Sequence, residues 1–127
     1  MVYRAGRPVM PQTVPDPHIV TVVLALLHHE PLDRRRLMQA VERRTSARLR
    51  LDEAAVRRLL RVLECGGAIR GRYVLPPRGP ADKEYFLTAE GVLRLRASCL
   101  EWARYRDGID ELLADVATDR GAGLPAR

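Results

Sequence analysis

Residues 33–91 read DRRRLMQAVERRTSARLRLDEAAVRRLLRVLECGGAIRGRYVLPPRGPADKEYFLTAEG and carry the clearest structural signals of this chain. The stretch opens with Asp33, a residue suited to cap a helix, followed by apolar residues at helical spacing: Leu37, Met38 and Val41. After a turn over 45–50, Asp52 is a second candidate cap. The apolar positions behind it recur at i, i+3, i+4 and i+7, and are Val56, Leu59, Leu60 and Leu63. This pattern predicts two amphipathic helices joined by a short turn.

A β-hairpin is predicted after the second helix. Gly66 and Gly67 stop that helix, and the segments 69–75 and 83–87 both alternate as strands do. The residues between them are rich in proline and fit a long hairpin tip. We therefore expect a fold that is mainly α with one small β-hairpin, arranged as a winged helix-turn-helix.

Four segments are predicted along the chain. Residues 1–16 contain several prolines and no apolar period, which predicts a flexible N-terminal arm. Residues 17–87 form the winged helix-turn-helix, whose first helix has Asp16 as its cap. Residues 88–118 form a long C-terminal helix capped by Thr88, and residues 119–127 a flexible tail.

Two apolar surfaces predict a homodimer. The first helix is apolar nearly all round, so we expect part of it to meet a second subunit, namely Val20, Val23 and Leu24. On the C-terminal helix, a seam with alternating spacings of four and three is interrupted once by Arg106. A seam of this kind on a long helix after a complete domain is typical of dimerisation. Its apolar members are Leu95, Cys99, Trp102, Ile109, Leu113 and Val116.

The excess of positive charge is confined to one part of the chain. Residues 33–78 hold thirteen arginines and five acidic residues, a net charge of +8, whereas 1–32 are neutral and 79–127 carry −2. A localised excess is expected of a surface that binds phosphates. The alternative is a solvated surface that keeps the protein soluble.

The second predicted helix is the candidate recognition helix. Opposite its leucine stripe, a helical wheel groups Ala54, Arg57, Arg58 and Arg61, which combine guanidinium groups with a small residue that permits close approach. We expect double-stranded DNA to be the partner of this face. Further contacts are expected from Arg35 and Arg36 on the preceding helix and from Arg70, Arg72 and Arg78 on the hairpin.

Acidic residues at the start of the recognition helix argue in the other direction. Asp52 and Glu53 suit a helix N-terminus, yet they would repel DNA phosphates if that terminus leads into the groove. A winged-helix module that binds protein and has lost DNA recognition therefore remains the alternative function.

Other classes of protein find little support. The sequence has no glycine-rich phosphate loop, no metal-spaced His and Cys set, and no nucleophile with a recognisable base, so we expect no enzyme, no cofactor and no metal. Cys65 and Cys99 are far apart and are expected to be free thiols. The apolar run 19–27 is too short to span a bilayer, and no secretory signal opens the chain, so we expect a cytoplasmic location and no membrane partner.

In the order of these segments, the chain resembles the PadR family of bacterial winged-helix transcription regulators over about 17–113. The residues 23–27 with Glu30-Pro31-Leu32 look like the opening helix and turn of the family, 51–69 like its recognition segment, and 85–91 like its wing exit. The resemblance implies a dimeric, sequence-specific transcription regulator, with repression as its mode of action.

The resemblance also has departures and one further implication. Asp33-Arg34-Arg35 stands where the family usually has His-Gly-Tyr, and 52–55 read Asp-Glu-Ala-Ala where Ser-Pro-Gly-Thr is usual, so no operator sequence is carried over. Trp102 falls where the C-terminal helix of the family often places an aromatic residue. In some relatives that region binds planar effectors, which implies a small aromatic effector at Trp102 or, alternatively, a Trp that only packs in the dimer interface.

Overall fold

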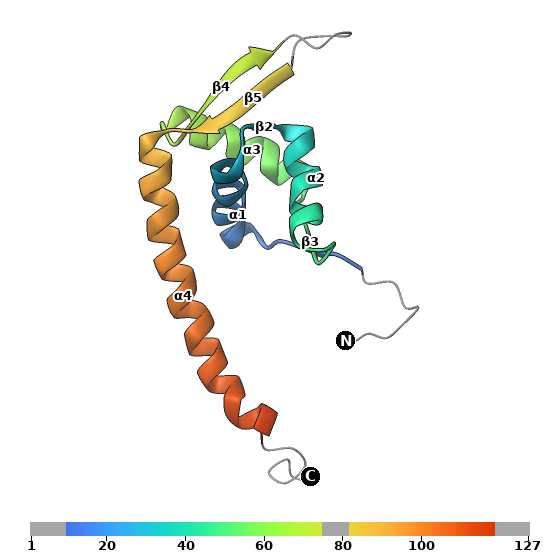
Figure 1. The fold of residues 1–127 in the computed structure, drawn as a ribbon, viewed down its shortest axis with the longest axis vertical. Helices are drawn as coiled ribbons and strands as arrows, with labels where there is room; N and C mark the ends of the chain where they lie inside the picture. Colours follow the sequence, from blue (N-terminus) through green and yellow to red (C-terminus); the bar gives the residue numbers. More distant parts are fainter. Residues whose placement is uncertain (1–9, 75–81, 119–127) are drawn as a thin grey trace. The chain divides into compact units, whose positions relative to one another are not determined.

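The computed structural model describes residues 10–74 and 82–118 (Figure 1). The chain divides into two compact units, Met1–Leu95 and Arg96–Arg127, which are described separately. The elements in chain order are β1 (Gln12–Thr13), α1 (Asp16–His29), β2 (Leu32–Asp33), α2 (Arg34–Arg44), β3 (Leu49–Arg50), α3 (Glu53–Cys65), β4 (Ile69–Val74), β5 (Asp82–Leu87) and α4 (Ala89–Thr118). This order of helix, helix and hairpin confirms the predicted fold class.

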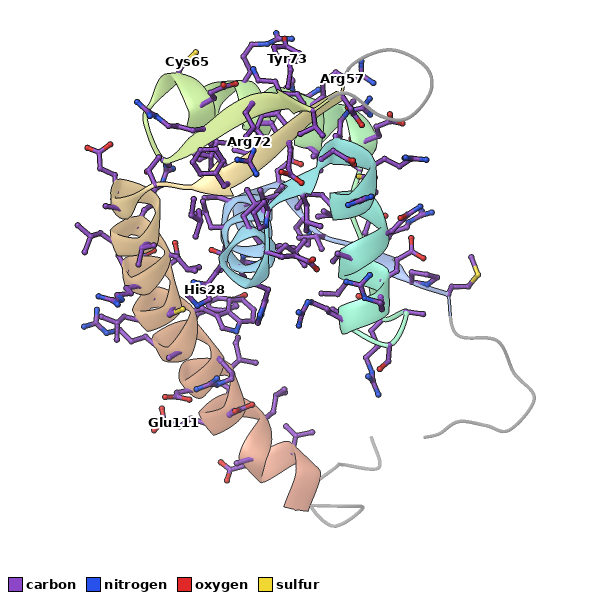
Figure 2. The ribbon with its side chains drawn as sticks, turned by 45° about the horizontal axis from the view of Figure 1, so that its top comes forward. His28, Arg57, Cys65, Arg72, Tyr73 and Glu111 are labelled. Atoms are coloured by element: carbon purple, nitrogen blue, oxygen red, sulfur yellow. The ribbon has the colours of Figure 1, made fainter. Side chains whose placement is uncertain are left out.

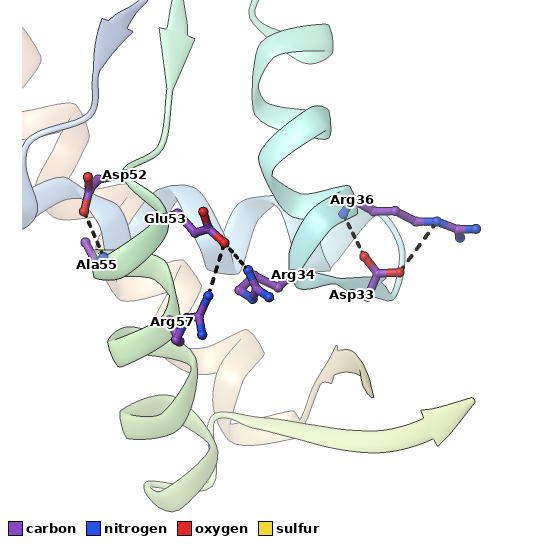
Figure 3. Close-up of polar contacts among 7 residues, drawn as sticks. All are labelled: Asp33, Arg34, Arg36, Asp52, Glu53, Ala55 and Arg57. Carbon is purple, nitrogen blue, oxygen red and sulfur yellow. Dashed lines mark hydrogen bonds and ion pairs between the residues drawn. The ribbon is translucent and has the colours of Figure 1, made fainter. Parts of the chain in front are cut away.

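Helices α2 and α3 begin at the caps that the sequence predicts. The Asp33 carboxylate accepts a hydrogen bond from the Arg36 amide at 2.7 Å, and the Asp52 carboxylate accepts one from the Ala55 amide at 3.0 Å (Figure 3). Each bond satisfies a backbone donor that the first turn of a helix leaves without a partner, which is worth about 1 kcal/mol. The two helices of the motif are therefore bounded by local chemistry.

Helix α1 is the centre of the core of the first unit, which corrects part of the predicted dimer surface. Val23 and Leu24 are completely buried, because α2, α3 and β5 all pack against this helix. Val20 is only half-buried. The helix is apolar nearly all round because its own domain surrounds it, and Val23 and Leu24 have no surface left for a second subunit.

Leu95 belongs to the same core. Its side chain is 7% exposed and lies in the buried cluster of the first unit, so it is not a member of a free seam on α4. The prediction was wrong for Leu95 because the apolar residues are spaced regularly along the whole of α4. The spacing alone does not show where the helix stops packing against its own domain and becomes exposed to solvent.

The N-terminal segment is ordered further upstream than predicted. Strand β1 pairs in parallel with β3, and the Val14 side chain behind it is 4% exposed. The expected flexible arm is therefore wrong for 12–14, because backbone hydrogen bonds and one buried apolar side chain fix these residues. Asp16, expected as the cap of α1, is instead its first residue, and Pro15 at the cap position makes no side-chain hydrogen bond. Residues 1–9 and 119–127 lie outside the described residues.

The predicted hairpin is confirmed. Strands β4 and β5 are antiparallel, with Ile69 opposite Leu87 and Val74 opposite Asp82, and β2 pairs with the other edge of β5. Gly67 ends α3 with a left-handed backbone of φ +86°, a conformation that glycine adopts without steric cost. Figure 1 shows the hairpin beside α3.

The wing exit is fixed by Thr88 and Gly91. The Thr88 hydroxyl donates to the Gly67 carbonyl oxygen at 2.6 Å and accepts from the Gly91 amide at 3.0 Å, and the Thr88 amide donates to the Ala68 carbonyl oxygen at 3.1 Å. A Cβ atom on Gly91 would overlap that carbonyl oxygen. The predicted cap of α4 is confirmed, and the close approach explains why a glycine stands at this position.

We expect Gly91→Ala to lower the free energy of unfolding by about 3 kcal/mol, because the new methyl group would meet a backbone oxygen that cannot move aside. Gly108→Ala is the matched control. Nothing lies within 4 Å of a Cβ at Gly108, so alanine should raise helix stability by about 1 kcal/mol. Denaturant unfolding measures both, and a Gly91→Ala protein as stable as the original would contradict the packing described.

Candidate nucleic-acid interface

Helix α3 exposes the face that the sequence predicts. Ala54, Arg57, Arg58 and Arg61 are all exposed, whereas Val56, Leu60 and Leu63 are buried. The helix thus presents guanidinium groups around one small residue, on the side away from the core.

The acidic residue Glu53 is paired with arginines from two helices. Its Oε2 atom lies 2.5 Å from Nη1 of Arg34 on α2 and 3.2 Å from Nη2 of Arg57 on α3 (Figure 3). We call these three residues the Glu53 triad. All three side chains are between 37% and 58% exposed, so solvent screens the pairs and each contributes at most about 1 kcal/mol.

Among the described residues, no acidic side chain pairs with Arg58 or Arg61 of α3. Within 10–74 and 82–118, neither side chain makes an ion pair or a hydrogen bond. Arg58 also borders a shallow groove of about 310 Å³ between α1 and α3, which it lines with Val20, Leu59 and Val62 among others. These two guanidinium groups can therefore bind an external anion without first breaking an ion pair or hydrogen bond to the described residues.

Arg70 and Arg72 lie on the face of the hairpin that points away from the core. The register sets Arg70 opposite Phe86 and Arg72 opposite Glu84, so these residues share one face as predicted. Ile69 is completely buried, so Ile69 and Gly71 lie on the packed face of the strand. The two arginines therefore lie on the opposite face. Figure 2 shows Arg72 and Tyr73 on different sides of the strand. The two arginines therefore lie on the side of the hairpin that is turned away from α3.

Arg72 has an internal counterion. Its Nη2 atom lies 3.2 Å from Oε1 of Glu84, and its guanidinium carbon lies 5.8 Å from the centroid of the Phe86 ring. The Arg72 side chain is 65% exposed, so the pair is weak and the cation stays accessible.

The hairpin is joined to α3 by Lys83, the only lysine of the chain, which the sequence reasoning missed. Lys83 Nζ donates to Oε1 of Glu64 at 2.8 Å and lies 5.7 Å from the ring centroid of Tyr73. The hydrogen bond to Glu64 raises the pKa of Lys83 above its ordinary value, so the ammonium group keeps its charge at neutral pH. Tyr73 is 72% exposed on this side of the hairpin.

The remaining predicted residues are placed as follows. Arg35 and Arg36 are exposed on α2, and Arg36 lies 3.8 Å from the Asp33 carboxylate. Arg78 falls in 75–81, outside the described residues. Within the described residues, no group of three His, Cys, Asp or Glu side chains could hold a metal ion, and no helix is long and apolar enough to cross a membrane. Cys65 and Cys99 are free thiols.

The second unit carries an exposed apolar stripe along α4. Its predicted members Cys99, Trp102, Ile109, Leu113 and Val116 are all exposed. Tyr105 and Leu112, at 57% and 72% exposed, extend the stripe. The prediction missed them because its seam passed through Arg106. The rings of Trp102 and Tyr105 lie 5.6 Å apart between centroids.

The first unit is therefore a winged helix, from which a long C-terminal helix continues. The chain has the fold of the PadR-like transcription regulators, as comparison with solved structures shows. A PadR family transcriptional regulator from Eggerthella lenta aligns with a TM-score of 0.66 and 25% identity, over 76% of this chain and 82% of that one.

Two further structures share the fold. A transcriptional regulator from Clostridium thermocellum gives a TM-score of 0.68 at 20% identity, over 75% of this chain and 89% of that one. Pex from a Synechococcus strain gives 0.61 at 27% identity, over 75% and 85%. No protein-family model matches the sequence, and a comparison with curated proteins gives no match.

A double-mutant cycle tests the link between hairpin and α3. We expect Glu64→Gln and Lys83→Met to couple by about 1 kcal/mol in denaturant unfolding, because this pair is only 30% to 31% exposed. The matched control is the more exposed pair Arg106 and Asp107 on α4, which should couple by roughly zero. Independent effects of the two substitutions at Glu64 and Lys83 would show that the hairpin is not held in this way.

Proposed function

We propose that this chain is a DNA-binding transcription regulator that acts as a homodimer. The observation that carries the proposal is the exposed face of α3, where Arg58 and Arg61 have no acidic partner within the described residues and a hairpin is tied to the same helix by Lys83. The likeness of the fold to named transcription regulators supports it.

The second helix of a helix-turn-helix enters the major groove, and its side chains contact base edges there. Arg58 and Arg61 have the fork-shaped guanidinium group that binds guanine or phosphate through two hydrogen bonds, and Ala54 leaves room for the helix to approach. Arg35 and Arg36 on α2 would contact the phosphate backbone. On the hairpin, the Tyr73 hydroxyl is better placed than Arg70 or Arg72 to donate to DNA beside α3. Tyr73 lies on the strand face that is turned toward α3, whereas the two arginines lie on the opposite face.

The apolar stripe on α4 is the proposed dimer interface. Trp102, Ile109, Leu112, Leu113 and Val116 recur at helical spacing, and between 38% and 72% of each side chain is exposed in the single chain. A second copy could cover the same stripe by twofold symmetry and so present two α3 helices to one duplex. Repression is the simpler mode of action, because it requires only that the dimer occupy promoter DNA.

A small aromatic effector is a further part of the proposal. The paired rings of Trp102 and Tyr105 offer a flat, partly exposed surface on the stripe that we assign to dimerisation. A ligand bound there could change how the two copies meet. In the alternative, the two rings only pack in the interface.

The competing function is a winged-helix module that binds protein. Val62 on α3 is 61% exposed and lines the groove next to Arg58, a feature that would suit an apolar partner better than a phosphate. In that case the protein should bind no DNA.

Salt titration of DNA binding separates the two functions. A dimer that neutralises about six to ten phosphates should lose roughly 10³-fold or more in affinity between about 50 and 200 mM salt. Arg58→Ala with Arg61→Ala should weaken binding to a selected site by about 1–3 kcal/mol for each base that the arginines no longer bind. The control is Arg96→Ala with Arg104→Ala, which removes the same charge from exposed positions on α4. No DNA binding, or equal effects of the two pairs, would contradict the proposal.

The dimer interface has its own test. We expect Ile109→Glu with Leu113→Glu to produce a monomer in analytical ultracentrifugation, because two carboxylates cannot be buried in an apolar seam without a large desolvation cost. Leu100→Glu is the control, since Leu100 is 65% exposed and lies on the opposite side of the helix. A dimer that survives the double substitution would place the interface elsewhere.

A further inference from the structure

Glu53 occupies a position where the helix dipole favours a carboxylate but DNA binding opposes one. It is the first residue of α3, at the end of the helix whose side chains we assign to the major groove, and its charge opposes binding to the DNA phosphates. Asp52 supplies the side chain that caps α3, so the Glu53 carboxylate is not required for the capping hydrogen bond.

The Glu53 triad shows what the carboxylate does in the free protein. A single oxygen, Oε2, holds Nη1 of Arg34 and Nη2 of Arg57, which come from two different helices (Figure 3). Two positive charges are thereby paired with one negative charge. While the triad is closed, Arg34 and Arg57 are oriented toward Glu53 and contribute less to phosphate binding than their number suggests.

The triad can be opened by a suitable donor. Its side chains are exposed, and exposed ion pairs of arginine and carboxylate are weak enough to exchange with other partners. In the major groove, the base-edge donor that a Glu carboxylate pairs with is the amino group of cytosine. On any duplex without that donor, an opened triad would leave the Glu53 carboxylate without a partner beside phosphates.

We propose that Glu53 is a specificity-determining residue of the DNA-binding surface. It holds Arg34 and Arg57 on non-cognate DNA and releases both to phosphates where a cytosine amino group becomes the donor to its carboxylate. The inference rests on the proposed function of α3 and adds to it a residue that lowers non-specific binding and reads one base.

The test compares the full chain with Glu53→Gln and Glu42→Gln. Glutamine keeps the size of the side chain and leaves the Asp52 cap in place, so the fold should persist. Glu42 is an exposed residue of α2 and has no ion pair within the described residues, so its substitution controls for the change in net charge. Each protein is titrated with a duplex of random sequence and with a selected site. A second version of the selected site has the base pair that faces Glu53 replaced.

Glu53→Gln should bind the random duplex roughly tenfold more tightly, because both arginines become available. Its salt dependence should be steeper by about 0.9 for each phosphate gained, which is about 1.8 for each subunit and about 3.6 for a dimer on one duplex. It should also lose its preference for cytosine in the selected site. Glu42→Gln should behave as the unaltered chain, and Glu53→Ala should change random-duplex binding in the same direction as Glu53→Gln.

Two failures are distinguishable. If the unaltered chain binds DNA with strong salt dependence and Glu53→Gln matches it on both duplexes, the role of Glu53 is overturned and the proposed function stands. If the unaltered chain binds no duplex at any salt concentration, the proposed function fails and the role of Glu53 with it.

Discussion

The hydrogen bonds of Thr88 to the backbone at Gly67 and Ala68 are the constraint on which the arrangement of this surface depends. They join the end of α3, the start of β4 and the first turn of α4 at one point, and Gly91 lets these backbones approach closely. Helix α3 and the hairpin both leave from this junction. Their relative placement is therefore set by the short Thr88 contacts at this junction, together with the Lys83–Glu64 pair further along the hairpin.

Electrostatics on this frame is decided by local pairing more than by the total charge. Glu53, Glu64 and Glu84 each hold basic side chains, which leaves Arg58 and Arg61 on α3 without a counterion in the described part of the chain. Exposed ion pairs each contribute about 0–1 kcal/mol to stability, so an anion that binds strongly can replace the carboxylate as the partner of a paired arginine. The net charge of +8 over 33–78 is therefore larger than the number of basic side chains that can bind an anion without first breaking an ion pair or a hydrogen bond.

The features that could be predicted from the sequence depend on residues that are close to one another in the chain. Asp33, Asp52 and Thr88 cap helices through bonds to amides three residues away, so short-range chemistry was enough to identify them. The hairpin followed from alternation and turn residues in the same way. These local signals were consistent with one another, and the order of the helices and the hairpin was correct, whereas the short strands β1, β2 and β3 were not predicted.

Apart from the cap of α1 and the line of the seam on α4, the errors concern partners distant in the sequence. A helical pattern shows that Val23, Leu24 and Leu95 are apolar, but it does not show whether their own domain or a second subunit covers them. The pairing of β1 with β3 joins residues 37 apart, and the bond from Arg34 to Glu53 spans 19. The side of the hairpin on which Arg70 and Arg72 lie depends on which face Ile69 buries, a tertiary property.

The proposed function requires that a homodimer present two copies of α3 to one duplex. Selection of random duplexes on the purified protein, followed by sequencing of those retained, tests it most directly. We expect an enriched inverted repeat whose half-sites are separated by about one helical turn, roughly 10 base pairs, or a multiple of it. Retained duplexes without any enriched sequence, or enrichment of a single unrepeated site, would contradict it.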